Sequence, residues 1–110
     1  MKTFEVKTMY STTPDCYLEV DEYAEGGHVA LSIWSESEGP FANLTVNLDS
    51  TKLYPKNFNF VDTNNFPQAI ELIQRLGIGR PTDRCGYSGF CSYPLYEFDM
   101  DAIKAWTEGE

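Results

Sequence analysis

The first half of this 110-residue chain has almost no positive charge. No lysine or arginine occurs between Lys7 and Lys52, and this interval contains eight acidic residues, which account for most of the formal net charge of −9. They are Asp15, Glu19, Asp21, Glu22, Glu25, Glu36, Glu38 and Asp49. Nucleic-acid backbones and anionic membranes attract positive charge, so we predict that the protein binds neither directly. The acidity favours either solubility or a partner protein with a basic surface.

The chain also lacks long apolar runs. No segment approaches the run of about 18 apolar residues that predicts a transmembrane helix. The first ten residues, MKTFEVKTMY, contain no apolar core typical of a signal peptide. We therefore expect a cytoplasmic protein. Its aromatic content of 15% argues against disorder and for a packed core.

Cysteine and histidine are scarce as well: the chain has only Cys16, Cys85, Cys91 and His28. An odd cysteine count without a signal peptide argues against a disulfide framework. Zinc sites need four nitrogen or sulfur ligands, usually in closely spaced pairs, and no CxxC pair is present. A site built from all four residues stays open, but the spacing favours cysteines packed as small apolar side chains. We predict no metal and no cofactor.

Catalytic combinations are equally sparse. A cysteine nucleophile would need His28 as its base, and we expect His28 to be a solvated residue in a turn or at a sheet edge. Cys85 follows Arg84, which makes it a candidate for reactivity but not for catalysis. GIGRPT at 77–82 follows a predicted helix instead of opening one, which is the wrong context for a phosphate loop.

Paired acids, such as Glu36 with Glu38 or Glu19 with Asp21, could share acid and base work only in a concave pocket. We expect these residues to be solvated. We therefore predict that the protein is not an enzyme, with a small hydrolase as the most distant alternative.

Apolar and polar residues alternate through most of the first half, which is typical of half-buried strands. The predicted strands span 2–9, 16–23, 28–35 and 41–48, joined by turns at 11–15, 25–27 and 36–40. The glycines of the middle turn suit a tight hairpin. This pattern predicts an antiparallel meander with one buried and one wet face.

The second half alternates less. Residues 49–65 predict a long connection with an extended piece at 58–61. Apolar residues at helical spacing predict a helix at 65–76, capped by Asn64 or Asn65 and ended by Gly77. A loop at 77–90, a strand at 91–98 and a short helix at about 101–107, capped by Asp99 or Asp101, complete the chain. Pro94 predicts that the last strand lies at a sheet edge or carries a bulge.

The fold prediction is therefore a single α+β domain spanning 1–110. An antiparallel β-meander of four to five strands carries one main helix on one face, followed by a short C-terminal helix.

Aromatic and acidic residues share the predicted outer face of this meander, a composition that suits protein binding. The candidate partner-binding residues are Tyr17, Glu19, Asp21, Tyr23, Trp34, Glu36 and Glu38, with Arg84 and Tyr87 as a secondary contact on the loop at 84–88. Three interpretations stay open: acids that only provide solubility and protect sheet edges, a general interaction face, and carboxylate rows that mimic nucleic acid. An interaction face requires that Tyr17, Tyr23 and Trp34 are not all buried.

Four segments carry a resemblance: WSESEGPFANLTVNL at 34–48, FVDTNNFP at 60–67, LGIGRPT at 76–82 and SGFCSYPLYEFD at 88–99. They resemble an uncharacterised domain-of-unknown-function family of small bacterial proteins, carried by conjugative elements and phages of gut Firmicutes. The resemblance implies a cytosolic accessory protein of a mobile genetic element. It brings no catalytic residues.

The predicted function is protein–protein contact by such a small acidic accessory protein. The alternative is a nucleic-acid mimic that inhibits a host defence or DNA-binding protein. The partner would be a protein with a basic surface, and the oligomeric state stays open.

Overall fold

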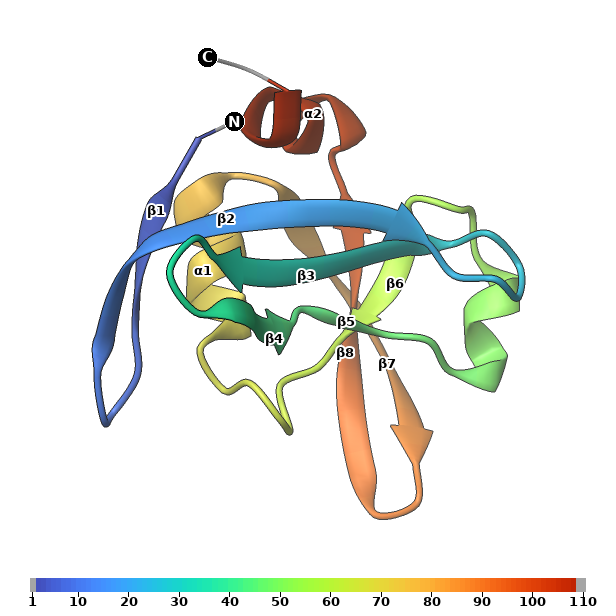
Figure 1. Cartoon of the computed structure of the whole chain (residues 1–110). Helices are drawn as coiled ribbons and strands as arrows, with labels where there is room; N and C mark the ends of the chain where they lie inside the picture. The colour runs from blue at the N-terminus through green and yellow to red at the C-terminus, as the bar shows by residue number, and fades with distance from the viewer. Residues whose placement is uncertain (1, 109–110) are drawn as a thin grey trace.

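Two antiparallel sheets and two helices form the computed structural model, which describes residues 2–108 (Figure 1). The first sheet has the strand order β1 (Phe4–Lys7), β2 (Thr12–Glu22), β3 (Val29–Ser35) and β4 (Gly39–Asn43). The second sheet has the order β5 (Thr45–Val46), β6 (Phe58–Val61), β8 (Cys91–Phe98) and β7 (Gly79–Ser88). The remaining elements are the 3₁₀ helix η1 (Asp49–Leu53), α1 (Ala69–Leu76) and α2 (Met100–Glu108). The α+β class is confirmed, and the first sheet is an antiparallel meander of four strands. The expectation that the strand at 91–98 extends this same sheet is wrong, because it belongs to the second sheet.

The first sheet follows the alternation of the sequence. In β3, Val29, Leu31 and Ile33 are buried, and the residues between them are half-buried on the opposite face. Gly26 and Gly27 have positive φ angles in the connection from β2 to β3, as the predicted hairpin requires.

The predicted turn at 11–15 is wrong, because β2 already begins at Thr12. The turn lies at 8–11, where the hydroxyl of Thr8 accepts hydrogen bonds from the N–H groups of Tyr10 and Ser11. A threonine hydroxyl that satisfies local backbone groups stabilises such a turn.

The predicted strand at 41–48 is divided between the sheets at Leu44. This residue is fully buried; its N–H donates to the Leu31 carbonyl at 2.9 Å, and its carbonyl accepts from the Asp62 N–H at 2.9 Å. The preceding residues form β4 of the first sheet, and the following residues form β5 of the second. Where two sheets pack across one another, a strand that changes sheets forms their corner.

The second sheet contains a strand that the sequence did not predict. Residues 77–90, expected as a loop, contain β7, which pairs with β8 in a hairpin that extends away from the body of the molecule (Figure 1). Seven of the ten residues of β7 are exposed and only Gly86 is buried, so the strand shows no alternation of apolar and polar residues.

β8 lies inside the sheet, not at its edge. Its pairing with β6 reaches only from Leu95 to Glu97, so Pro94 lies beyond the end of β6 and costs no ladder bond on that side. A register shift between Pro81 and Cys85 forms the irregularity, on the partner strand β7.

Two apolar clusters hold the layers together. The larger lies between the inner face of the first sheet, α1, α2 and one face of the second sheet. The smaller lies on the opposite face of the second sheet, where Phe60, Tyr93 and Leu95 pack under Leu48 and Tyr54 of the η1 region. The second sheet is therefore covered on both faces near its centre.

The helices differ from the predictions mainly at their beginnings. α1 starts at Ala69, because Asn65 donates from its backbone and side chain to Asp62 and holds a turn instead of capping the helix. Gly77 ends α1 with a φ of 68°, as expected. α2 starts at Met100 and is capped by Asp99, whose Oδ1 accepts two backbone N–H groups; with nine residues it is longer than α1, which has eight. None of the helices within residues 2–108 has the length and apolar character needed to cross a bilayer.

Buried polar groups join the sheets at the η1 end. Asn59 is fully buried, and its side-chain amide donates to the Val29 carbonyl of β3 at 3.1 Å while its Oδ1 accepts from the Thr51 hydroxyl. His28 is also buried, with 4% exposure, and its Nε2–H donates to the Tyr54 carbonyl at 2.7 Å. The expectation of a solvated His28 is wrong, because the η1 segment, which the sequence did not reveal, covers it.

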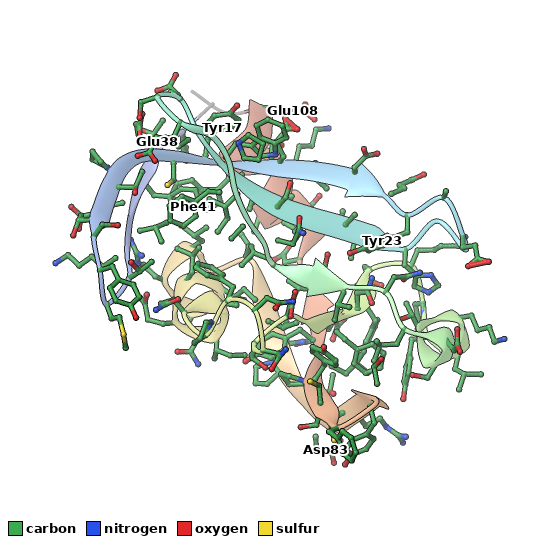
Figure 2. The ribbon with its side chains drawn as sticks, turned by 60° about the horizontal axis from the view of Figure 1, so that its bottom comes forward. Tyr17, Tyr23, Glu38, Phe41, Asp83 and Glu108 are labelled. Atoms are coloured by element: carbon green, nitrogen blue, oxygen red, sulfur yellow. The ribbon has the colours of Figure 1, made fainter. Side chains whose placement is uncertain are left out.

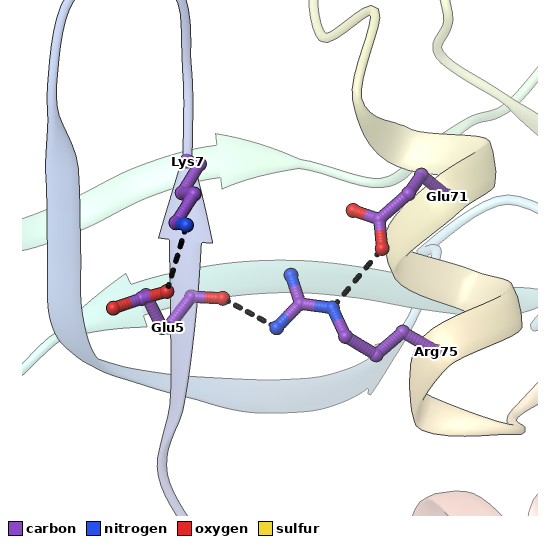
Figure 3. Close-up of polar contacts among 4 residues, drawn as sticks. All are labelled: Glu5, Lys7, Glu71 and Arg75. Carbon is purple, nitrogen blue, oxygen red and sulfur yellow. Dashed lines mark hydrogen bonds and ion pairs between the residues drawn. The ribbon is translucent and has the colours of Figure 1, made fainter.

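Arg75 connects α1 to the free edge of β1 (Figure 3). Its guanidinium donates to the Glu5 carbonyl at 2.7 Å and to the Glu71 carboxylate at 3.1 Å. Lys7 lies 3.8 Å from the Glu5 carboxylate on the same strand. Charged side chains at an edge strand discourage pairing with another chain.

Candidate functional site

An aromatic pair lies on the outer face of the first sheet. Tyr17 of β2 and Trp34 of β3 are direct cross-strand partners, and both are half-buried. The Trp34 indole N–H donates to the Ser32 hydroxyl at 3.2 Å, which satisfies its polar group within the face. In Figure 1, α1 lies behind β2 and β3, and no helix among residues 2–108 lies in front of these two strands. Tyr17 and Trp34 therefore offer flat apolar surface to solvent.

Carboxylates flank the aromatic pair on both sides. Glu19 and Asp21 follow Tyr17 along the same face of β2 and are exposed. On the other side, Glu36 and Glu38 are exposed in the turn from β3 to β4. Figure 2 shows Glu38 at the same end of the sheet as Tyr17. The register thus places four of the predicted residues on one face, namely Tyr17, Glu19, Asp21 and Trp34, and the adjoining turn carries Glu36 and Glu38.

Asp15 fixes the turn that carries Glu36 and Glu38. Its carboxylate accepts the Ser37 N–H at 2.8 Å and the Ser35 hydroxyl at 3.0 Å, and its carbonyl accepts the Glu36 N–H at 3.1 Å. The hydrogen bonds from Ser37 and Ser35 hold the pKa of Asp15 below its usual value, because they stabilise the ionised carboxylate. The turn is therefore anchored to β2 by a charged group.

Tyr23 does not belong to this face. It lies past the end of β2, and its hydroxyl is 3.1 Å from the Thr45 carbonyl and 3.0 Å from the Thr45 hydroxyl of the second sheet. Burial raises the pKa of the Tyr23 phenol, so the hydroxyl keeps its proton and donates. Tyr23 links the two sheets.

Arg84 and Tyr87 lie on a separate surface, the β7–β8 hairpin. Tyr87 is 72% exposed, and Phe90 at the hairpin tip is fully exposed. Asp83 marks this hairpin in Figure 2, far from Tyr17 and Glu38. The predicted secondary contact is therefore spatially distinct from the acidic aromatic face.

The cysteines do not come together. Cys85 pairs with Pro94 across the hairpin and Cys91 pairs with Ser88, so the alternation of the strands puts Cys85 and Cys91 on opposite faces. The Cys85 thiol is exposed and lies 3.3 Å from the Tyr87 hydroxyl. Cys16 is buried in the core, and burial raises the pKa of its thiol. Within residues 2–108, no three His, Cys, Asp or Glu side chains gather as ligands for a metal.

Sequence reasoning missed most of the exposed apolar side chains. They are Met9, Tyr10, Val20, Leu53, Phe90 and Met100, in addition to Tyr87. Met9 fell in a predicted strand, and Val20 has the inward parity of a core residue. Only Phe90 could have been expected to be exposed, because Gly89 before it marks a turn that would direct the next side chain to solvent.

Comparison with known proteins gives one match. No curated protein and no solved structure matches the chain. A family model, described as Domain of unknown function (DUF4313), matches residues 17–109. This range includes the aromatic pair, its flanking carboxylates, the β7–β8 hairpin and all of α2. Because the match covers most of the sequence, the chain belongs to the DUF4313 family of unknown function.

Proposed function

We propose that the protein is a small acidic accessory protein of a mobile genetic element, which acts in the cytoplasm by contact with a protein that presents a basic surface. The supporting observation is the open outer face of β2 and β3, where Tyr17 and Trp34 lie side by side between exposed carboxylates. We name this surface, made of Tyr17, Glu19, Asp21, Trp34, Glu36 and Glu38, the acidic aromatic face. Trp and Tyr are the residues most often found at the energetic centre of protein interfaces.

The chemistry of the face suits a basic protein partner. Aromatic rings bury large areas and also bind arginine and lysine side chains through their π faces. Carboxylates at the rim steer a basic partner to the site and fix its orientation. Both contributions meet at the same place, because the β2–β3 register puts Tyr17 opposite Trp34 and Glu19 opposite Ser32.

The nucleic-acid mimic has less support. Glu19 and Asp21 are two residues apart on one strand, which separates them by about 6.6 Å. One strand of DNA carries one charge per nucleotide and continues this row over many nucleotides. Two carboxylates beside an aromatic pair reproduce only a short piece of that row.

Affinity capture with matched variants tests the proposal. The protein, immobilised through its C-terminus, would capture partners from a lysate of a host bacterium, quantified by mass spectrometry. The double variant Tyr17→Thr/Trp34→Thr should reduce capture of the specific partner by roughly tenfold or more, as loss of interface anchors does. The control Tyr10→Thr/Leu53→Thr removes two exposed apolar side chains elsewhere and should retain it.

A second pair of variants tests the role of charge. Glu19→Gln/Asp21→Asn and the control Asp49→Asn/Asp83→Asn remove the same charge, and all four positions are exposed. Only the first should weaken capture. A nucleic-acid mimic would instead show a steep loss of binding with salt and little dependence on Tyr17 and Trp34. Equal capture by all variants would contradict the proposed face.

A further inference from the structure

β2 has an unpaired backbone edge toward its end, beyond the stretch that lies beside α2 (Figure 1). β1 pairs with β2 only as far as Cys16, and within residues 2–108 no other strand pairs with the following residues on that side. The Tyr23 N–H donates to the His28 carbonyl at 2.9 Å, so alternate residues from Tyr23 backwards direct their backbone groups to β3. Val20 and Glu22 consequently direct theirs away from the sheet. The Glu22 N–H is already taken by the Asp21 carboxylate at 2.8 Å. The edge therefore presents the N–H and carbonyl of Val20 and the carbonyl of Glu22 to another strand.

A groove with an apolar floor runs beside this edge. It has a volume of about 530 Å³ and lies between β2, the segment Lys56–Asn57 and the first residue of α2. Val20 points to the same side of β2 as the buried Leu18 but is 40% exposed, and Met100 is 42% exposed. A second groove of about 600 Å³ shares Asn57 and Met100 with the first. The two grooves adjoin at these two residues, and we call them together the trough.

The trough is negatively charged. Its lining includes Asp21, Glu22, Glu97, Asp99 and Asp101 against only Lys56 and Arg80. Both cations are already engaged within the molecule: Lys56 donates to the Gly26 carbonyl, and Arg80 lies 2.7 Å from the Glu97 carboxylate. An occupant of the trough would therefore meet a surplus of acidic charge.

We propose that the open edge of β2 and its trough bind an extended, basic peptide segment of the partner, which adds to the first sheet as a further strand. Its backbone would pair with the N–H and carbonyl of Val20 and with the carbonyl of Glu22, and alternate side chains would enter the groove against Val20 and Met100. Lysine or arginine side chains of the segment would meet the acids of the rim. Backbone pairing supplies affinity in this binding mode, and the side-chain pockets supply specificity. The inference rests on the proposed function and names the kind of segment through which the partner binds.

A second copy of the same chain fits this edge poorly. Pairing of two β2 edges would bring Asp21 and Glu22 of one copy against acidic residues of the other. Like charges that face each other across strands destabilise the pairing. The acidic edge thus favours a basic partner over self-association.

Peptide selection against the whole protein tests the proposal. Random ten-residue peptides displayed on phage would be selected on the immobilised protein, and the winners would be synthesised with a fluorescent label. We expect basic peptides with alternating apolar positions. In amide NMR spectra, their binding should shift the signals of residues 18–22 and of Met100. N-methylation of alternate backbone nitrogens should abolish binding in one register and spare it in the other, because only one set faces β2.

Variants localise the effect on the protein. Val20→Lys puts a cation on the edge and removes part of the apolar floor, so it should weaken the selected peptides by about tenfold or more. Leu53→Lys makes the same charge change at another exposed apolar residue and should stay within about twofold of wild type. The N-methylation series uses the wild-type protein, so it holds even if Val20→Lys folds poorly.

Three results would overturn the inference: winners that shift only the β7–β8 hairpin, winners insensitive to N-methylation in both registers, or no enrichment of basic peptides. A dimer in sedimentation equilibrium that Val20→Lys dissociates would show that a second copy occupies the edge instead.

Partner capture separates this inference from the proposed function. Capture that depends on Tyr17 and Trp34 but not on Val20 would keep the acidic aromatic face and reject the edge.

Discussion

The two sheets of this molecule use their second faces in opposite ways. The first sheet packs its inner face on the main core and leaves its outer face, with Tyr17 and Trp34, open to solvent. The second sheet packs one face on the same core and the other on Phe60, Tyr93, Leu95 and the η1 region. The first sheet can therefore carry a binding surface at little cost in stability, while substitutions on either central face of the second sheet should affect folding.

A substitution of Phe60 should give the largest difference in stability between the two sheets. Its side chain is 1% exposed on the second face of the second sheet and contacts Tyr54 edge-on, with ring centroids 6.2 Å apart. Phe60→Ala should lower the free energy of unfolding by about 3–5 kcal/mol. Glu19→Ala, at an exposed position on the outer face of the first sheet, should change it by no more than about 0.5 kcal/mol. Urea denaturation followed by circular dichroism measures both, and similar losses would mean that the two faces do not differ.

Gly86 tests how tightly the smaller cluster is packed. A Cβ at this position would lie 2.7 Å from the Phe60 ring and 2.8 Å from Leu48. Gly86→Ala should therefore destabilise the protein by about 1–3 kcal/mol through overpacking. The control Ser88→Ala lies at an exposed position of the same strand. Equal thermal midpoints for the two variants would show that the cluster yields to an added methyl group.

Tyr23 tests the link between the sheets through pH. Its folded-state pKa is raised, so its contribution is present below the unfolded value of about 10 and is lost as pH rises beyond it. Tyr23→Phe should cost about 0.5–1.5 kcal/mol at pH 7 for the lost hydrogen bond to Thr45. The loss of thermal stability between pH 9 and 11 should also be smaller in this variant than in wild type. An unchanged alkaline loss would assign it to other groups, among them the buried Tyr96.

Asp15 should give the smallest effect, because it acts at the exposed end of the first sheet. Its folded-state pKa is lowered, so its contribution is present above the unfolded value of about 4 and is lost as pH falls through the folded value. Asp15→Asn should lower the thermal midpoint slightly at neutral pH, and the difference from wild type should vanish in acid. NMR signals of Ser37 should report the loosened turn directly. A difference that persists at low pH would contradict a role of the charged carboxylate.

The first sheet, with one open face, could be predicted from the sequence better than the second sheet, which is covered on both faces near its centre. The open face of the first sheet produces alternation, so β3 and the outward parity of Tyr17, Glu19 and Trp34 could be predicted. β7 has Pro81, two glycines and almost no buried residue, so nothing local distinguishes it from a loop; only pairing with β8 makes it a strand. The burial of His28 could not be predicted either, because η1 covers it from more than 20 positions away in sequence.

The acidic aromatic face could be predicted from the sequence, whereas the open edge of β2 could not. The face needs only the parity of two neighbouring strands. The edge depends on where β1 stops pairing and on how Met100 and Asn57 approach Val20, which are tertiary facts. Tyr23 was misplaced for a related reason, since the residue that leaves the strand can turn to the other sheet.

The corner at Leu44 has a consequence for how the protein opens. Its two backbone hydrogen bonds, to Leu31 and to Asp62, tie one residue to both sheets at once. Neither sheet can detach without moving the residue that holds the other, so partial unfolding of one sheet should be suppressed. Amide protons of β3 and β8 should then exchange with deuterium only through global unfolding, with the same opening free energy. A molecule that opens as one unit keeps the acidic aromatic face of the first sheet ordered for as long as the fold persists.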